Sequence, residues 1–209
     1  TFQNAGYLQL DIGNQNVDNR VKSLTVLPDN QLMLTGDHLT FAGDFSTPSK
    51  YSLFLLKMTQ DGNPDTTFNE LGYRIYTEEE LPTHDSDEDL LSLSAQGVDL
   101  KAASDSLYIT INREIYSSNK AVQLMKVGLD GVIDANWSAP YSGVTAYDIE
   151  GIRSHGTLST TSALVLYGHN HGNIGYNYFA SQWLAKVSLT GGFDTEFGYQ
   201  GQTTLSSSS

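Results

Sequence analysis

Residues 56–68 read LKMTQDGNPDTTF, and the landmarks of this stretch return in MKVGLDGVIDANW at residues 125–137 and in AKVSLTGGFDTEF at residues 185–197. Each stretch has a lysine, a glycine five residues later, an aspartate three residues after the glycine, and an aromatic residue three after the aspartate. A partial fourth copy, TFQNAGY at residues 1–7, matches TFNELGY at residues 67–73. Repetition at a fixed spacing predicts a chain built from similar structural units.

The landmark aromatic residues mark three periods, being 66, 69 and 60 residues apart: Phe2, Phe68, Trp137 and Phe197. Between them, apolar residues alternate or cluster between turn-forming residues, which predicts short strands. The strands expected in the first period span residues 7–12, 21–27, 31–35 and 51–58. Those expected later span residues 71–76, 97–102, 107–111, 122–127, 146–152, 163–167 and 183–187. Four antiparallel strands in a period match the content of one β-propeller blade.

We therefore expect an all-β fold of three four-stranded antiparallel, blade-like repeats. Closed propellers have about four to eight blades, so three repeats would form part of a propeller or would be completed in an oligomer. The strand-like ends, residues 7–12 and 201–205, are candidates for pairing with another chain, because an unpaired strand edge recruits a partner strand. We expect a single domain at residues 1–205, with repeats at about 2–67, 68–136 and 137–197 and a terminal strand at 198–205. A serine-rich tail follows at residues 206–209.

Composition limits the classes of partner. With 24 acidic and 11 basic residues the net charge is −13, which argues against binding the phosphate backbone of nucleic acid or an anionic membrane. The chain contains no cysteine, which excludes disulfides, thiolate metal sites and a cysteine nucleophile. No apolar run reaches the roughly 18 residues of a membrane span, so we expect no membrane insertion.

The first copy of the motif, with the glycine that follows it at position 72, resembles the delta-60 repeat of bacterial β-propeller-like proteins. The third copy keeps FDTEFG at residues 193–198 and Gly201, and VLPDNQLMLTG at residues 26–36 is similar to the family's hairpin. The second copy departs from the pattern, with Ala135-Asn136 in place of a Thr-Ser pair and no glycine following Trp137. The resemblance covers essentially the whole chain. It implies a large secreted or cell-surface bacterial protein, and it implies no reaction and no fixed catalytic residues.

The motif itself suggests two roles. Asp61, Asn63 and Asp65 place oxygen atoms at alternate positions, as calcium-binding loops do. The other copies lack this ligand pattern, so we favour a structural turn in which the aspartate bonds nearby backbone N–H groups. For the recurring lysines, Lys57 and its counterparts, we expect a packed aliphatic stem and an exposed ammonium group.

An acidic run offers a second candidate metal site. Asp85, Asp87 and Asp89 alternate, with His84 and Glu88 beside them, and clustered carboxylates suit Ca²⁺. The run lacks the glycine and the terminal glutamate of an EF-hand loop. A solvated loop between strands is therefore the simpler interpretation, and calcium is the one cofactor that the sequence suggests.

A third candidate combines aromatic and histidine residues near the end of an expected strand. Its members are Tyr167, His169, Asn170, His171, Tyr176 and Tyr178. The alternating histidines could chelate zinc or copper, although no third ligand is evident. A tyrosine-rich polar loop is equally suited to binding a protein or carbohydrate, because tyrosine stacks and hydrogen-bonds with little loss of entropy.

Three hypotheses for function follow. The first is a non-catalytic, extracellular propeller module that binds or displays a protein or carbohydrate ligand. The second is a structural subunit that polymerises with copies of itself by exchanging terminal strands. The third is a glycan-active enzyme, and it is the least favoured, because the sequence has no Gly-x-Ser-x-Gly elbow and no recognisable Ser/His/Asp arrangement.

Overall fold

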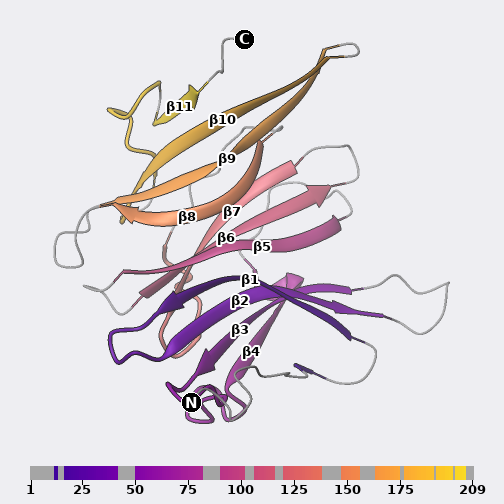
Figure 1. Cartoon of the computed structure of the whole chain (residues 1–209), viewed down its shortest axis with the longest axis vertical. Helices are drawn as coiled ribbons and strands as arrows, with labels where there is room; N and C mark the ends of the chain where they lie inside the picture. Colours follow the sequence, from indigo (N-terminus) through magenta and orange to yellow (C-terminus); the bar gives the residue numbers. More distant parts are fainter. Residues whose placement is uncertain are drawn as a thin grey trace.

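The computed structural model describes residues 12–13, 17–41, 50–81, 90–101, 106–115, 120–137, 147–155, 163–174, 177–190, 192–199 and 201–205. Within these residues nearly all regular structure is β-strand, with one turn of 3₁₀ helix, η1 (Glu78–Glu80). The strands form three antiparallel sheets, which are stacked along the long axis of the molecule in chain order (Figure 1). The prediction of a mostly β fold with four-stranded antiparallel sheets is confirmed.

The first sheet has the order β1 (Val17–Val26), β2 (Leu32–Thr40), β3 (Lys50–Met58) and β4 (Tyr73–Thr77). The turn between β1 and β2 is the predicted Pro-Asp-Asn sequence, in which Asn30 has a positive φ of 60°. Asparagine tolerates this conformation better than most residues, which is why a tight hairpin forms here.

The fourth strand of this sheet comes from the next sequence period. We expected residues 7–12 and the next three strands to form one sheet, but β4 pairs with β3 in the register Leu56↔Tyr73 to Ser52↔Thr77. The motif at residues 56–68 reverses the chain tightly, so the strand after it returns along the free edge of β3. Sheet and sequence repeat are therefore out of phase by one strand. Residues 1–11 lie outside the described residues.

The second sheet contains β5 (Leu90–Lys101), β6 (Ser106–Ile115) and β7 (Lys120–Gly128) in that order. The segment that would correspond to β4, residues 138–146, lies outside the described part of the chain. The described part of the second sheet therefore has three strands, and its predicted fourth strand is not tested.

The third sheet has the order β11-β10-β9-β8, from β8 (Tyr147–His155), β9 (Ala163–Ile174), β10 (Asn177–Ser188) and β11 (Gln202–Leu205). The C-terminal strand β11 pairs with β10 of its own chain, in the register Gln182↔Leu205 to Ala185↔Gln202. It is therefore an edge strand that is paired on one side within its own chain, and pairing with another chain stays a prediction. The third motif reverses the chain just before β11 and directs it to the neighbouring edge.

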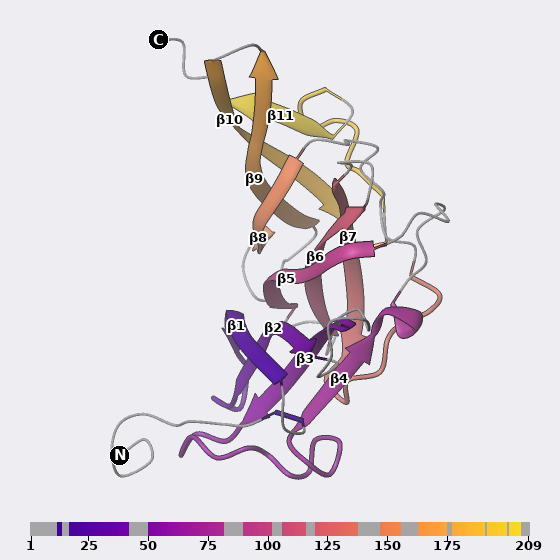
Figure 2. The same ribbon diagram turned by 90° about the vertical axis from the view of Figure 1, so that its right-hand side faces the viewer.

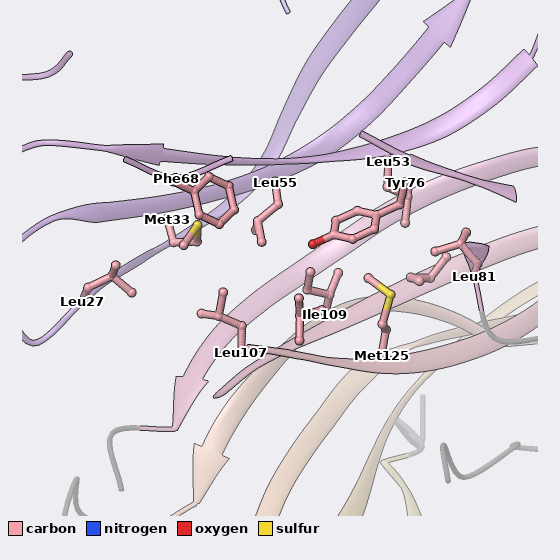
Figure 3. Packing of buried hydrophobic residues seen from close by; sticks show 12 residues of the cluster. Leu27, Met33, Leu53, Leu55, Phe68, Tyr76, Leu81, Leu107, Ile109 and Met125 are labelled. Atoms are coloured by element: carbon pink, nitrogen blue, oxygen red, sulfur yellow. The ribbon is translucent and has the colours of Figure 1, made fainter. Parts of the chain in front are cut away.

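Alternate residues of a strand lie on opposite faces of its sheet, as the two-residue period of a strand requires. Leu53 and Leu55 of β3 belong to the core shared with the second sheet, whereas Phe54 and Leu56 lie on the opposite side of the first sheet. In the middle sheet, Ile109 joins the core toward the first sheet and Tyr108 joins the core toward the third. Figure 3 shows the first of these cores, with side chains from both sheets meeting between the ribbons.

Each sheet therefore has a preceding face and a following face. The preceding face is turned toward earlier parts of the chain and carries Leu56 and Met58 in the first sheet. The following face is turned toward the next sheet and carries Leu55 in the first sheet and Leu124 in the second. The first strand of each later sheet reaches across its predecessor: β5 contacts β1, β2 and β3, and β8 contacts β5, β6 and β7 (Figure 2).

Candidate binding surface and the repeated turn

The three copies of the sequence motif form the same turn at the end of the third strand of each sheet. In the first copy the Asp65 backbone N–H donates to the Lys57 carbonyl at 2.9 Å, and the Phe68 N–H donates to the Asp65 carbonyl at 2.8 Å. The equivalent bonds from Asp134 and Asp194 to their lysine carbonyls measure 2.9 and 2.8 Å. Identical hydrogen bonding in three places explains why the spacing from lysine to aromatic residue is invariant.

The motif lysine and aspartate form an ion pair in every copy. The Nζ–Oδ2 distances are 3.1 Å for Lys57–Asp65, 2.6 Å for Lys126–Asp134 and 2.7 Å for Lys186–Asp194. The ammonium group, which we expected only to be exposed, is thus engaged by the aspartate of its own motif. The turn folds the chain back on itself, so residues eight apart in sequence face each other across it.

These contacts stabilise the charged form of each aspartate. A hydrogen bond from the Thr67 hydroxyl and the Lys57 ammonium lower the pKa of Asp65 below its ordinary value. Hydrogen bonds from Lys126 and Lys186 lower the pKa of Asp134 and of Asp194 in the same way. Burial opposes the shift in each case, and the hydrogen bonds outweigh it.

The arrangement around Asp65 supports the structural interpretation of the motif over the calcium-loop interpretation. One carboxylate oxygen pairs with Lys57, and the other accepts hydrogen bonds from the Thr67 N–H at 3.0 Å and the Thr67 hydroxyl at 2.6 Å. An oxygen that already has two donors is a poor ligand for a cation, and an adjacent ammonium group repels one. Across the described ranges, no three His, Asp or Glu side chains form a potential metal site.

The aromatic residues of the first two motifs connect their own sheet to the next. Phe68 is 3% exposed, and its ring lies so close to the second turn that a Cβ on Gly131 would come within 2.9 Å of it. Trp137 donates its indole N–H to the Leu189 carbonyl of the third turn at 2.9 Å, and its ring meets Tyr108 edge-on. The second and third turns thus each contact the aromatic residue of the preceding motif.

Five of the six predicted ligand-binding positions lie on β9 and β10. Tyr167, His169, Asn170 and His171 fall within β9, and Tyr178 is in β10 opposite Asn173. Residue 176 lies outside the described residues. The expected loop after position 167 is instead strand, because β9 and β10 pair continuously from Ala163↔Ser188 to Ile174↔Asn177.

Among the described residues, this hairpin extends beyond the other strands of its sheet. The last pair with β8 is Tyr147↔Asn170, and β11 reaches only Gln182. The described residues beyond these pairs, 171–174 and 177–181, therefore form a two-stranded arm, which Figure 1 shows at the upper end of the molecule. The structure brings the predicted positions together along one hairpin. Asp85, Asp87 and Asp89 lie outside the described residues.

Sequence analysis missed a polar cluster around His38. This residue is 5% exposed, its Nδ1 lies 2.7 Å from the Asn19 Oδ1, and the Asn19 amide donates to the Ile12 carbonyl at 3.0 Å. Since an amide oxygen only accepts, His38 must donate from Nδ1. Burial lowers the pKa of His38. A histidine alternating with apolar residues in β2 was the one available signal.

Comparison with protein-family models, with curated proteins and with solved structures finds no match. In the described part of the chain, no helix has the length and apolar character needed to span a membrane. The function must therefore be argued from the geometry of the chain itself.

Proposed function

We propose that this chain is a non-catalytic, extracellular β-propeller-like module that binds or displays a protein or carbohydrate ligand through the β9–β10 arm. The three sheets are interpreted as consecutive blades, related to the delta-60 repeat that the motif resembles. Support for this architecture comes from the stacking in chain order, from the same turn at the same place in each sheet, and from first strands that each lie across the preceding sheet.

The arm carries the proposal for binding. It is a strand hairpin that extends past the strands on both of its sides, among the described residues, and its sequence is rich in polar and aromatic residues. Backbone groups at the edges of such an arm can add a strand from a protein ligand, and tyrosine and histidine can stack on a sugar ring. The recurring charged residues of the chain, by contrast, are engaged in the repeated turns, which supports a structural role for them.

The test is a binding screen against glycan and protein arrays, comparing the chain with a variant in which three arm residues, His171, Asn173 and Tyr178, are changed to alanine. Tyr199→Ala is the matched control, since Tyr199 is 80% exposed but lies in the third turn and not on the arm. We expect the triple variant to lose captured ligands and the control to retain them. The same screen with chelator present separates a metal-dependent site from a direct one. Equal binding by all three proteins would refute the assignment to the arm.

A further inference from the structure

The first and third sheets, at the two ends of the stack, expose apolar positions whose counterparts are buried at the junctions between sheets. On the preceding face of the first sheet, three β1 side chains in the same row as Leu32 and Leu34 are half exposed: Val21 at 55%, Leu24 at 55% and Val26 at 54%. Ile12 covers the β3 side of this face, where Leu56 is 2% exposed. The open part is therefore the β1 side.

The opposite end has the complementary surface. On the following face of the third sheet, Leu184 occupies the position of Leu55 and Leu124, which are 0% and 1% exposed beneath the next sheet. Leu184 is itself only partly buried, as is Val165, which opposes Lys186 in the same row of side chains. Phe197, the aromatic residue of the third motif, is also partly buried, although its counterpart Phe68 is 3% exposed.

The same kind of interface between sheets occurs twice within the chain. One of its two contact surfaces is open on the first sheet, and the other is open on the third sheet. In both internal junctions the first strand of one sheet lies across the first three strands of the sheet before it. The strand β1 is such a first strand with no preceding sheet in the described ranges, and β8, β9 and β10 are such a platform with no following sheet there. Continuing the pattern would place β1 of one molecule across β8–β10 of another.

We propose that a second copy of this chain docks head to tail on the first, and that the reciprocal contact closes the pair into a ring of six sheets. A head-to-tail interface forms a ring if its rotation closes and an open filament if it does not. Two copies of three sheets fall within the range of about four to eight blades that closed propellers contain. The contact is made by faces of sheets, and it does not require exchange of β11, which is already paired in its own chain. It is independent of ligand binding by the arm.

The experiment uses two charge variants of the whole chain. The first, Leu24→Glu with Val26→Glu, alters the β1 end, and the second, Val165→Lys with Leu184→Lys, alters the platform. The matched control is Val132→Lys with Leu71→Lys, because these side chains are 54% and 59% exposed but lie in the turns. Masses are measured by light scattering and native mass spectrometry from roughly 1 to 100 μM, since specific interfaces of ordinary size reach micromolar or tighter affinity.

We expect the wild-type chain and the control to form a dimer, with twice the mass of the 22.9 kDa chain. Each charge variant alone should dissociate, its dissociation constant raised by roughly 100-fold or more, because an unpaired charge would be buried at both junctions. An equimolar mixture of the two variants should form a mixed dimer, in which one junction is unaltered and the other pairs Glu with Lys. A monomeric wild-type chain, a growing filament, or variants that dimerise alone would overturn the proposal.

Hydrogen exchange of the wild-type chain provides a measurement that does not depend on the folding of any variant. Comparing dilute with concentrated protein, amides of β1 and of β8–β10 should gain protection together, while those of the middle sheet should not change. Protection that appears at only one end, or at neither, would contradict head-to-tail docking.

Discussion

Phe68 and Phe197 occupy the same position of the same motif, and the structure predicts that replacing them has unequal effects. Phe68 is 3% exposed between the first and second sheets, and its ring touches the turn at Gly131. Truncating a fully buried phenylalanine costs about 3–5 kcal/mol, so Phe68→Ala should lower the free energy of unfolding by that amount. Phe197 is only partly buried, so it contributes about half of the 1.5–3 kcal/mol that full burial of such a side chain provides.

The assay is urea unfolding of both alanine variants at low protein concentration, followed by tryptophan fluorescence. A difference of about 1.4 kcal/mol between them corresponds to a tenfold difference in the unfolding constant. We expect at least that difference, with unchanged m-values. Equal losses for the two variants would refute the reasoning, because they would show that the aromatic residue acts within its own sheet and not through the turn of the next one.

Three further predictions concern a close approach at a glycine, a buried histidine and the motif aspartates. Gly72→Ala should destabilise the chain more than Gly192→Ala. Both glycines have a positive φ, but only at Gly72 would an added Cβ meet another atom, the Pro64 Cβ at 2.6 Å. Thermal denaturation of the two variants compares their stabilities. Because the pKa of His38 is lowered in the folded state, the unfolded chain binds the proton more readily, and stability should fall as the pH decreases below about 6.5. Urea unfolding against pH should show a shallower slope for His38→Gln, and an identical slope would contradict the assignment. The lowered pKa values of the motif aspartates predict a second loss of stability, starting as the pH falls through about 3.8 and ending below their folded pKa values.

The sequence predicted the units of this fold better than their boundaries. The strands around residues 31–35, 51–58 and 122–127 were predictable because apolar residues there are bounded by strong turn signals. The grouping into sheets was not, because the conspicuous landmark is a turn, and the strand after a turn pairs backward as readily as it starts a new unit. The motif indicated where the chain reverses. Only the register of β3 with β4 shows that the strand after the turn pairs back onto the sheet before it.

The candidate site shows the same limit. HNHGNI at residues 169–174 resembles a loop, since asparagine and glycine are uncommon in strands. It is nevertheless strand, because the pairing of β9 with β10 continues through it and overrides local preference. The recurrence of the lysine and the aspartate could be seen in the sequence, but their contact could not. The partners are eight positions apart and come together only when the turn closes. The exposed row of side chains on β1 could not be predicted without knowing the bulge between Val21 and Ser23, because a bulge shifts which residues share a face of the sheet.

Backbone amides in the three repeated turns can report how local stability differs between the three sheets. Asp65, Asp134 and Asp194 donate equivalent backbone hydrogen bonds of 2.9, 2.9 and 2.8 Å, so the local opening of these amides should cost similar free energy. They differ in their surroundings: the middle sheet packs against the first sheet on one face and the third on the other, whereas each outer sheet, in the described part of the chain, packs against another sheet on one face only. In a monomer, the Asp134 amide should therefore exchange most slowly, because exposing it requires both cores to open.

In a closed ring every sheet has a neighbour on both faces, so the three amides should approach the same rate as the protein concentration rises. Slowest exchange at Asp134 in dilute protein, followed by convergence, is the expected pattern in native-state hydrogen exchange. If Asp134 exchanged faster than both of its counterparts in dilute protein, the cores on either side of the middle sheet would not be the source of its stability, and the stacking argument would fail.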